Sequence, residues 1–394
     1  MREKDNKINH QNSFWLTAMV GVLLVGLGVF LYSTLEKASS QNPAAVETSK
    51  GEKEEKNPVP RELKMLAVGD IMLARKVGSL MNSRGVDYPF LKVEERLNGA
   101  DITFGNLECA ISKRGVPLPG KGIWFRASPE VTGKLKDSGF DILSIANNHA
   151  YDYDTYAFLD TMEYLRQEGI RHVGGGANLD FARDPVIMEV GDMGIGFLSY
   201  TEMADIFWSY QKPVMFQADT AEPGVAPYDV ELILEDIKEL RERVDTVVLS
   251  LHWGVEYSHR PTDKQRSEAY QFIDAGADLI IGHHPHVVQG LEVYNQGIIA
   301  YSLGNFIFDQ NWSQATREGL MLGIRLNKLG IIDARLYPLI INDSQPNFQE
   351  NQETKNLASK VRDFSRELGT ELNLSQSPLY LSIPNLNIVN NNDG

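Results

Sequence analysis

The sequence predicts an α/β fold, because short apolar runs recur along the chain and helix-like stretches separate several of them. The strand-like runs are Leu63–Val68, Ile102–Phe104, Ile142–Ile145, Ile195–Tyr200, Thr246–Leu251, Leu279–Ile281 and Ile298–Leu303. The helix-like stretches are Thr155–Gln167, Val230–Arg243 and Asp263–Ala275. This alternation is typical of sheets that are at least partly parallel. From the 290s through the 330s the pattern changes to successive strands, which favours a mixed or two-sheet architecture.

The length and charge of the chain limit its class. Its 394 residues are enough for one large domain or two ordinary ones with a substantial core. The formal net charge is −15, and the body of the chain contains no run of basic residues. Because phosphate backbones are recognised by clustered Lys and Arg, we expect no nucleic-acid partner.

The N-terminal segment indicates a membrane anchor. Residues 14–35 carry no formal charge over 22 positions, enough for a helix to cross a hydrocarbon core of about 30 Å. Basic residues within residues 1–13 favour a cytoplasmic N-terminus and an extracellular domain. A cleaved signal peptide is the alternative, but its apolar region is usually about 7–15 residues long, and residues 37–40 form a poor cleavage site. We therefore expect a single-pass protein of the cell membrane.

The remaining segments differ in composition. Residues 36–60 are rich in Glu, Lys, Ser and Pro and are expected to form a flexible linker. Residues 61–343 contain the strand and helix patterns of the main domain. Residues 344–394 form a polar C-terminal extension, with one helix predicted near Lys355–Leu368. Cys109 is the single cysteine, so no intramolecular disulfide can form, and we expect it to pack as a small buried apolar residue.

Polar side chains follow six of the predicted strands. Ligand sites in α/β sheets lie at the carboxyl ends of strands. The residues at these positions are Asp70, Asn106, Glu108, Asn147, Asn148, His149, His252, Trp253, Glu256, His283, His284, His286, Asn305 and Asp309. Any one of the Asp or Asn residues is explained by a turn or a helix cap. Because buried polar groups are costly unless they have partners, all six groups together predict one shared site.

The residue types at these strand ends indicate a metal centre. Imidazoles together with Asp, Glu and Asn oxygens suit Zn, Mn or Fe, whereas a calcium site would use oxygens alone. The run from Gly282 to His286 contains three imidazoles. In an extended segment His284 and His286 point the same way and His283 points opposite. We therefore predict His284 and His286 as ligands and His283 as a supporting or packing residue.

Six motifs in order resemble those of the CapA family of capsule-biosynthesis proteins. They are GDIML at 69–73, GNLE at 105–108, ANNHAYDY at 146–153, HWGVEY at 252–257, GHHPHVVQG at 282–290 and YSLGNFIFDQ at 301–310. The family includes the PgsA subunit of poly-γ-glutamate synthase and is related to calcineurin-like metallophosphoesterases. The resemblance covers roughly residues 63–340. It implies a metallophosphatase-like β-sandwich flanked by helices, with a divalent metal at the strand ends.

The resemblance also implies roles for particular residues. The expected metal ligands are Asp70, Asn148, His252, His284 and His286. Glu108 takes the place of a bridging carboxylate or asparagine, and His149 that of a charge-stabilising histidine or general acid, which makes these two the catalytic candidates. The residues expected to contact substrate are Arg75, Asn106, Trp253, Glu256, Asn305 and Asp309. A guanidinium such as that of Arg75 can bind a polymer carboxylate bidentately, although a surface salt bridge explains it equally well.

Two positions depart from the related motifs. Calcineurin-like enzymes carry Asp-x-His in the first motif, whereas this chain has Asp70-Ile71-Met72, so one metal position loses a ligand. A complete two-metal site is therefore in question. Asp154 stands where CapA proteins usually have glycine, and we expect it to cap the helix that follows.

Three functional hypotheses follow. The first is an extracellular accessory protein of poly-γ-glutamate or related capsule polymer synthesis and export. Its partners would be the anionic polymer, the membrane and membrane-bound subunits of the polymer synthase. The second is a metal-dependent hydrolase of a phosphoester or amide bond at the cell surface. The third is a degenerate pocket that only binds polymer ends, which the missing imidazole at Met72 favours. The sequence leaves open whether the chain is an enzyme.

Overall fold

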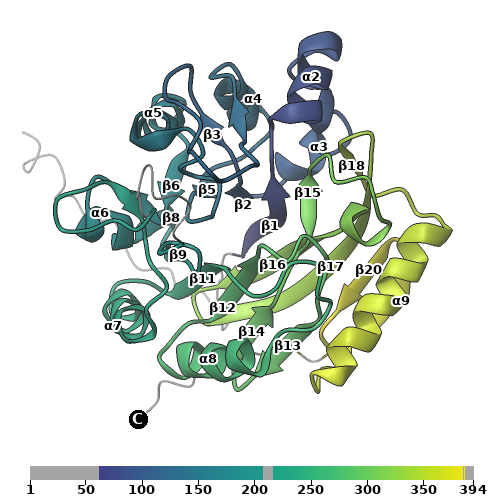
Figure 1. Ribbon diagram of the computed structural model, residues 1–394. Coiled ribbons are helices and arrows are strands. Elements are labelled where there is room, and N and C mark those ends of the chain that lie inside the picture. The colour runs from purple at the N-terminus through teal and green to yellow at the C-terminus, as the bar shows by residue number, and fades with distance from the viewer. Residues whose placement is uncertain (1–61, 207–215, 385, 387–394) are drawn as a thin grey trace, which may run out of the picture. The chain divides into compact units, whose positions relative to one another are not determined.

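The computed structural model describes residues 62–206, 216–384 and 386 (Figure 1). Within these residues the chain forms a mixed α/β fold with two large sheets. The predicted anchor (14–35) and the predicted linker (36–60) lie outside the described residues, so both stay predictions. No helix in the described part of the chain is long and apolar enough to cross a membrane.

The larger sheet has ten strands among the described residues, in the order β19-β20-β17-β16-β1-β2-β5-β6, with β15 beside β1 and β18 beside β17. Strands β1, β2, β5, β6 and β15 are joined in parallel, and the other pairs are antiparallel. The strands are β1 (Leu63–Ile71), β2 (Ile102–Leu107), β5 (Ile142–Ser144), β6 (Arg171–Val173), β15 (Asn305–Ile307), β16 (Glu318–Asn327), β17 (Gly330–Asn342), β18 (Gln345–Asn347), β19 (Asn373–Gln376) and β20 (Leu379–Ser382).

The smaller sheet has six strands in the described residues, in the order β13-β14-β12-β11-β9-β8. Its four central strands are parallel and its two edge strands are antiparallel to them. The strands are β8 (Val186–Val190), β9 (Met193–Thr201), β11 (Thr246–His252), β12 (Leu279–His283), β13 (Leu291–Tyr294) and β14 (Gly297–Ala300). Two short pairs complete the strands: β3 (Ala110–Ile111) with β4 (Arg126–Ala127), and β7 (Gly175–Gly176) with β10 (Gly224–Val225).

The two large sheets pack against each other through a shared apolar core. The ring centroids of Phe104 on β2 and Phe197 on β9 lie 5.8 Å apart across the interface. Along β9, Ile195 and Phe197 belong to this core, whereas Leu198 and Tyr200 belong to the cluster on the opposite face of the sheet. Strands that are buried on both faces need apolar residues at consecutive positions, which is why they appear in the sequence as continuous apolar runs.

Helices cover both outer faces of the two sheets (Figure 1). The larger sheet is covered by α2 (Arg75–Arg84), α3 (Glu94–Leu97), α4 (Val131–Asp137) and α5 (Asp154–Gln167), and the smaller one by α6 (Leu179–Arg183), α7 (Val230–Arg241) and α8 (Asp263–Asp274). The remaining helix, α9 (Gln352–Glu367), places Leu357 and Val361 in the core between the sheets. Two 3-10 turns, η1 (Tyr88–Phe90) and η2 (Ala315–Arg317), complete the helical elements of the described residues.

The predicted alternation of strands and helices is confirmed, including the run of successive strands β13 to β17. Cys109 is buried in the core on the outer face of the larger sheet, as predicted. The C-terminal extension contains the predicted helix as α9. It also contains β18, β19 and β20, which sequence reasoning missed. These strands pair with the larger sheet, so the described part of the extension belongs to the same fold.

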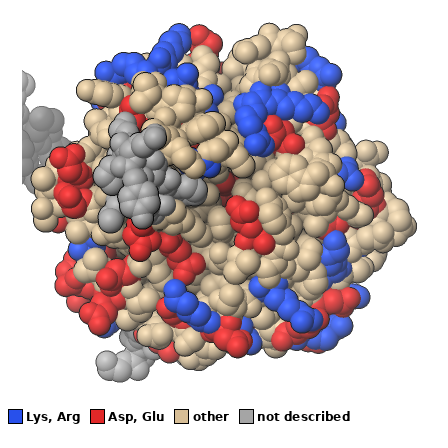
Figure 2. All heavy atoms as spheres, viewed as in Figure 1, with Lys and Arg blue, Asp and Glu red and all other residues tan. Residues whose placement is uncertain are grey.

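The surface carries charges of both signs. Figure 2 shows basic and acidic side chains interspersed on one face, with acidic side chains gathered over α7. That helix contributes Glu231, Glu235, Asp236 and Glu239. Two of these carboxylates pair with Arg183 of α6, so part of the negative charge on this face is balanced.

Candidate metal centre

Strand register brings the predicted site residues together at the carboxyl ends of the parallel strands. Asp70 near the end of β1 is the register partner of Asn106 on β2 and of Asn305 on β15. In the other sheet, His252 at the end of β11 is the register partner of His283 at the end of β12. Side chains at matching positions of neighbouring strands are only about 5 Å apart, so the sheets themselves assemble this cluster.

The carboxylate of Asp70 lies at the middle of the cluster. Its Oδ1 accepts a hydrogen bond from Asn106 Nδ2 at 2.8 Å, and His283 Nδ1 is 3.3 Å from the same oxygen. His286 bridges two carboxylates: its Nδ1 is 3.4 Å from Asp70 Oδ2, and its Nε2 is 3.6 Å from Glu108 Oε1. All of these side chains are buried.

The cluster fits a divalent cation. Asp70, Glu108 and His252 each offer one ligand atom, and these atoms lie within 4.8 Å of one another. Asp70 Oδ2, Glu108 Oε1 and His284 Nδ1 are buried and have no hydrogen-bond partner among the described residues. Buried acceptors without partners cost free energy, and a cation among them would remove that cost. The mixed oxygen and imidazole donors suit a transition metal.

The other predicted ligands lie beside this set. Asn148 Oδ1 is 3.1 Å from His252 Nε2, and the ring centroids of His252 and His284 are 4.8 Å apart. Asn106, predicted as a substrate contact, is buried among them, with its amide 3.5 Å from His252 Nδ1. The structure therefore brings all five predicted ligands and Glu108 into one cluster; their roles as ligands remain a prediction.

The ionisation of these groups follows from burial and crowding. Burial raises the pKa of Glu108 well above its usual range, and the nearby Asp70 carboxylate raises it further. Burial lowers the pKa of His252 well below its usual value and that of His284 to about 3, which keeps both imidazoles neutral and available as ligands. Burial also lowers the pKa of His286, but Glu108 and Asp70 outweigh it and raise the pKa to about 9.

A histidine and a carboxylate flank the centre as a pair. Asp152 Oδ2 lies 2.7 Å from His149 Nδ1, so the carboxylate accepts the Nδ1–H and directs Nε2 toward Glu108 Oε1, 3.9 Å away. The Phe125 ring stacks on the imidazole with centroids 3.9 Å apart. Burial lowers the pKa of His149 to about 4, although Asp152 opposes the shift. An imidazole held in this way can donate or accept a proton at Nε2.

Sequence reasoning missed Asp152, the carboxylate of this pair, and Lys121, which holds it. Lys121 is almost fully buried and donates to the Asp152 carboxylate and to the Asn148 carbonyl, with its Nζ 3.3 Å from His149 Nδ1. Asp152 follows His149 by three positions within the ANNHAYDY motif at 146–153, a spacing that could have identified it. Lys121 lies in a glycine-flanked loop after Gly120, where nothing in the sequence distinguishes it from a solvated lysine.

Three predicted substrate contacts lie near the surface. Arg75 forms an ion pair with Asp309, and its guanidinium lies 4.6 Å from the centroid of the Phe125 ring. Arg75 keeps 34% of its side chain exposed, so it remains within reach of a ligand. Glu256 is exposed and close enough to Glu108 to contribute to that residue's raised pKa. These residues border the centre from the surface side.

Trp253 and Asn305 are not placed to contact a substrate. Trp253 has 0% exposure, and its Nε1 donates to the Tyr301 carbonyl at 3.2 Å inside the core of the smaller sheet. Asn305 is buried, and its Oδ1 lies 3.0 Å from His286 Nδ1 while its Nδ2 donates to the Thr316 carbonyl. Trp253 therefore stabilises the core, and Asn305 orients His286.

The backbone of the histidine run differs from the extended conformation that the sequence analysis assumed. The backbone φ angles of His284 and His286 are 95° and 56°, so strand alternation stops at His283. Consequently the His283 ring is not turned away from the centre but lies beside Asp70. Positive φ in a residue other than glycine is strained and tends to occur at functional sites.

Comparison with known proteins agrees with this arrangement of motifs. The chain matches the family described as bacterial capsule synthesis protein PGA_cap over residues 64–310. The protein belongs to this family. It is 33% identical to the capsule biosynthesis protein CapA of Bacillus anthracis over 292 residues, which cover 72% of this chain and 69% of the relative. It is 34% identical to the PGA biosynthesis protein CapA of Bacillus subtilis (strain 168) over 310 residues, 78% of each chain.

A solved structure of a phosphatase from Mycoplasma pneumoniae is also similar, with a TM-score of 0.44 and 11% identity. The alignment covers 76% of this chain and 100% of that one. The predicted resemblance to the CapA proteins is confirmed by the family match and by the two Bacillus relatives.

The two departures noted in this PGA_cap chain have structural explanations. The sulfur of Met72 accepts a hydrogen bond from the Ala74 N–H at 3.1 Å, so it serves the turn after β1. Asp154 has a φ of 67°, a conformation that favours glycine. Its carboxylate compensates by accepting the N–H groups of Tyr156 at 2.9 Å, in the first turn of α5, and of Val116 at 3.0 Å. Asp154 thus has the capping role that was predicted.

Proposed function

We propose that this PGA_cap protein is a membrane-anchored extracellular accessory protein of poly-γ-glutamate or related capsule polymer synthesis and export, and that it works through a divalent metal centre. The role is supported by relatives named for capsule and PGA biosynthesis. The anchor is supported by the uncharged segment 14–35 and the basic residues before it. The polymer and the membrane-bound synthase subunits are the proposed partners.

The observation that carries the metal centre is the convergence of buried ligand atoms. The oxygens Asp70 Oδ2 and Glu108 Oε1 are buried without a hydrogen bond from any described residue, and Asp70, Glu108 and His252 each offer a ligand atom within the same 4.8 Å set. Asp70, Glu108, Asn148, His252, His284 and His286 would hold Zn, Mn or Fe there. A bound divalent cation supplies Lewis-acid polarisation of an ester or amide oxygen.

A hydrolase acting on a phosphoester or amide bond is the second candidate, and the His149–Asp152 pair favours it. The pair would let His149 Nε2 donate a proton to the leaving group or accept one from the attacking nucleophile. Lys121 and Asp152 hold this imidazole in place. The Phe125 ring stacks on the imidazole, and the Arg75 guanidinium also lies over that ring. A pocket that only binds polymer ends needs no such buried proton-transfer group.

Gene deletion with complementation tests this proposal. We expect deletion to abolish extracellular polymer, the full-length chain to restore it, and His252→Ala to fail to restore it. His259→Gln is the matched control, because that histidine lies outside the centre and contacts the Val288 carbonyl at 2.9 Å. Unchanged polymer in the deletion strain would contradict the capsule role. Full restoration by His252→Ala would contradict only the role of the metal centre and leave the capsule role standing.

The hydrolase candidate needs its own test. We expect the metal-loaded full-length chain to cleave a member of a phosphoester and amide substrate panel, and His149→Gln to lower the rate at least about a hundredfold while retaining metal. A chain that retains metal, supports polymer formation and cleaves no member of the panel would favour polymer binding instead.

A further inference from the structure

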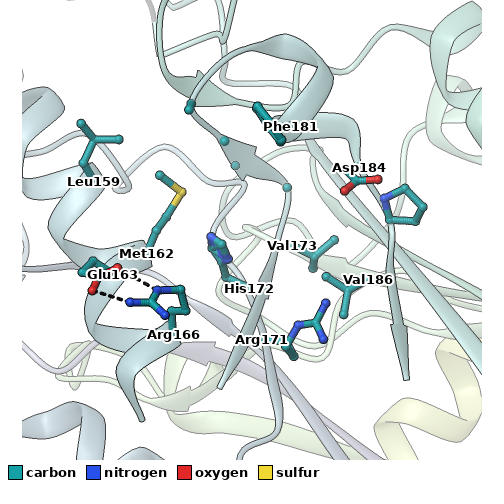
Figure 3. Close-up of a pocket in the computed structure, with 15 residues that line it drawn as sticks. Leu159, Met162, Glu163, Arg166, Arg171, His172, Val173, Phe181, Asp184 and Val186 are labelled. Carbon is teal, nitrogen blue, oxygen red and sulfur yellow. Dashed lines mark hydrogen bonds and ion pairs between the residues drawn. The ribbon is translucent and has the colours of Figure 1, made fainter. Parts of the chain in front are cut away.

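A pocket lies beside β6, the last strand in the order of the larger sheet, and none of its lining residues belongs to the metal centre (Figure 3). Its volume is about 430 Å³, which is within the range of small-molecule sites. Leu159 and Met162 of α5 line one side, Val186 of β8 lines the other, and Phe181 of α6 stands over it. These walls are apolar, so water in the pocket is readily displaced by an apolar ligand group.

Phe181 is unusual among the apolar residues that line the pocket, because it is largely exposed. Its side chain is 63% exposed, although it is a large aromatic residue on a short helix. Gly176 allows this placement, because a Cβ there would come within 2.6 Å of the Phe181 Cβ and 2.4 Å of the Ala182 nitrogen. The close approach of α6 to β7 therefore holds the ring over the pocket. The ring thereby adds apolar surface at the mouth of the pocket.

The pocket also contains backbone groups that can pair with an amide. Strand β6 ends the order of the larger sheet. Arg171 N donates to the Asp141 carbonyl at 2.9 Å, and the Val173 carbonyl accepts from Ile145 N at 3.0 Å. In a parallel ladder the intervening residue points its N–H and C=O to the other side. The N–H and C=O of His172 thus face the open edge, where no strand of the described residues pairs with β6.

One cation at the pocket has no counter-charge. Arg166 is held by Glu163 through two hydrogen bonds of 2.8 Å, which balances its charge. Arg171 lines the pocket and forms no ion pair with any described residue. A guanidinium is a strong bidentate partner for a carboxylate. Asp184 lies on the β8 side of the pocket, and its carboxylate disfavours a ligand that carries a negative charge on that side.

We propose that this pocket binds a small molecule with one amide, an apolar side group and one carboxylate, that is, an N-acylated apolar amino acid or the carboxyl end of a peptide. The amide pairs with the N–H and C=O of His172, as an added strand would. The carboxylate pairs with Arg171, and the apolar group fills the space between Met162, Val186 and Phe181. This site is separate from the metal centre and does not depend on the proposed function.

Calorimetric titration of the full-length chain with N-acetyl-leucine tests the proposal. We expect saturable one-to-one binding, and at least about tenfold weaker binding of N-acetyl-leucine amide, which lacks the carboxylate, and of 4-methylpentanoate, which lacks the amide. A longer peptide that ends in leucine separates the two sources. Tighter binding of that peptide indicates a chain end, and weaker binding indicates a free N-acyl amino acid.

Variants locate the binding. Arg171→Gln is expected to weaken binding at least about tenfold, and Met162→Trp, which fills the pocket, to abolish it. Arg166→Gln is the matched control and is expected to change binding less than about twofold, because Glu163 already balances that charge. Absence of saturable binding, or binding unchanged by both Arg171→Gln and Met162→Trp, would overturn the proposal. Unchanged melting temperatures show that each variant is folded.

Discussion

The metal centre and the edge pocket use the same larger sheet in opposite ways. The centre lies at the carboxyl ends of β1 and β2, where buried carboxylates and imidazoles approach within 4 Å and some ligand atoms have no partner. The pocket lies beside β6, with apolar walls and its charged groups at exposed positions. Buried unpaired charge costs stability, whereas an apolar hollow with exposed charges costs little. We therefore expect the centre to hold a cation, whereas the pocket can stand empty.

The largest expected difference between the two regions is in metal affinity. Replacing His252 by alanine should weaken divalent metal binding by about a hundredfold or more, since even residues that only support metal ligands contribute tenfold to a hundredfold. Competition with a chelator of known affinity measures the change. Arg171→Gln in the pocket should leave metal affinity unaltered. Equal affinities of wild type and His252→Ala would place the metal elsewhere.

A substitution at the centre is expected to raise the stability of the metal-free chain, although it lowers the affinity for metal. Glu108→Gln removes a buried carboxylate beside Asp70, so we expect it to stabilise the metal-free protein by about 1–4 kcal/mol at pH 8. Because burial raises the pKa of Glu108 above 4.5, folding takes up a proton, and stability falls as the pH rises above that value. The advantage of the variant should therefore vanish near pH 4.5.

Urea unfolding of the chelator-treated chain at pH 4.5 and pH 8 measures this effect, with Glu163→Gln as a matched control on the surface. Glu108→Gln should also weaken metal binding, so that the stability of the metal-free protein rises while the metal affinity falls. A variant that is less stable than wild type at pH 8 would show that Glu108 stabilises the fold without metal.

A smaller effect is expected at the pocket, from the imidazole of His172. Burial, together with the positive charge of the neighbouring Arg171, lowers its pKa to about 4. The unfolded chain therefore binds more protons between pH 6.5 and pH 4, and stability falls as the pH is lowered through that range. His172→Gln should retain about 2–3 kcal/mol more of its pH 7 stability at pH 4 than wild type does. Parallel pH profiles of the two proteins in thermal melts would exclude this shift.

The smallest effect is expected from the exposed cation of the pocket. Arg171→Gln should change the free energy of unfolding by less than about 0.5 kcal/mol, as is usual for exposed side chains without strong partners. Urea unfolding at pH 7 measures it. A loss above 1 kcal/mol would mean that Arg171 has a structural role, and the contrast between the two regions would weaken.

The positions of the site residues could be predicted because the apolar runs show where each buried strand ends. Strands buried on both faces appear as apolar runs, and the polar residues that follow each run must lie at one edge of the sheet. Asp70, Asn106 and His252 were found in this way. The fold class followed from the same runs and from the helices between them.

Other features depend on contacts that have no local sequence pattern. The orientation of His283 could not be predicted, since the positive φ angles after it end the strand alternation. Lys121 becomes a buried cation only because Asp152 and the Asn148 carbonyl surround it. Strand β19 (Asn373–Gln376) has a single apolar residue, Leu374, and exists through pairing with β20, so its sequence predicts no strand.

The central claim is that the strand-end cluster holds a divalent metal ion. X-ray diffraction from crystals of the full-length chain grown with Zn or Mn, collected on both sides of the metal absorption edge, tests it most directly. The account predicts an anomalous peak within about 2.0–2.3 Å of ligand atoms of Asp70, Glu108 and His252. It would be contradicted by density without such a peak, with His286 still bridging the two carboxylates.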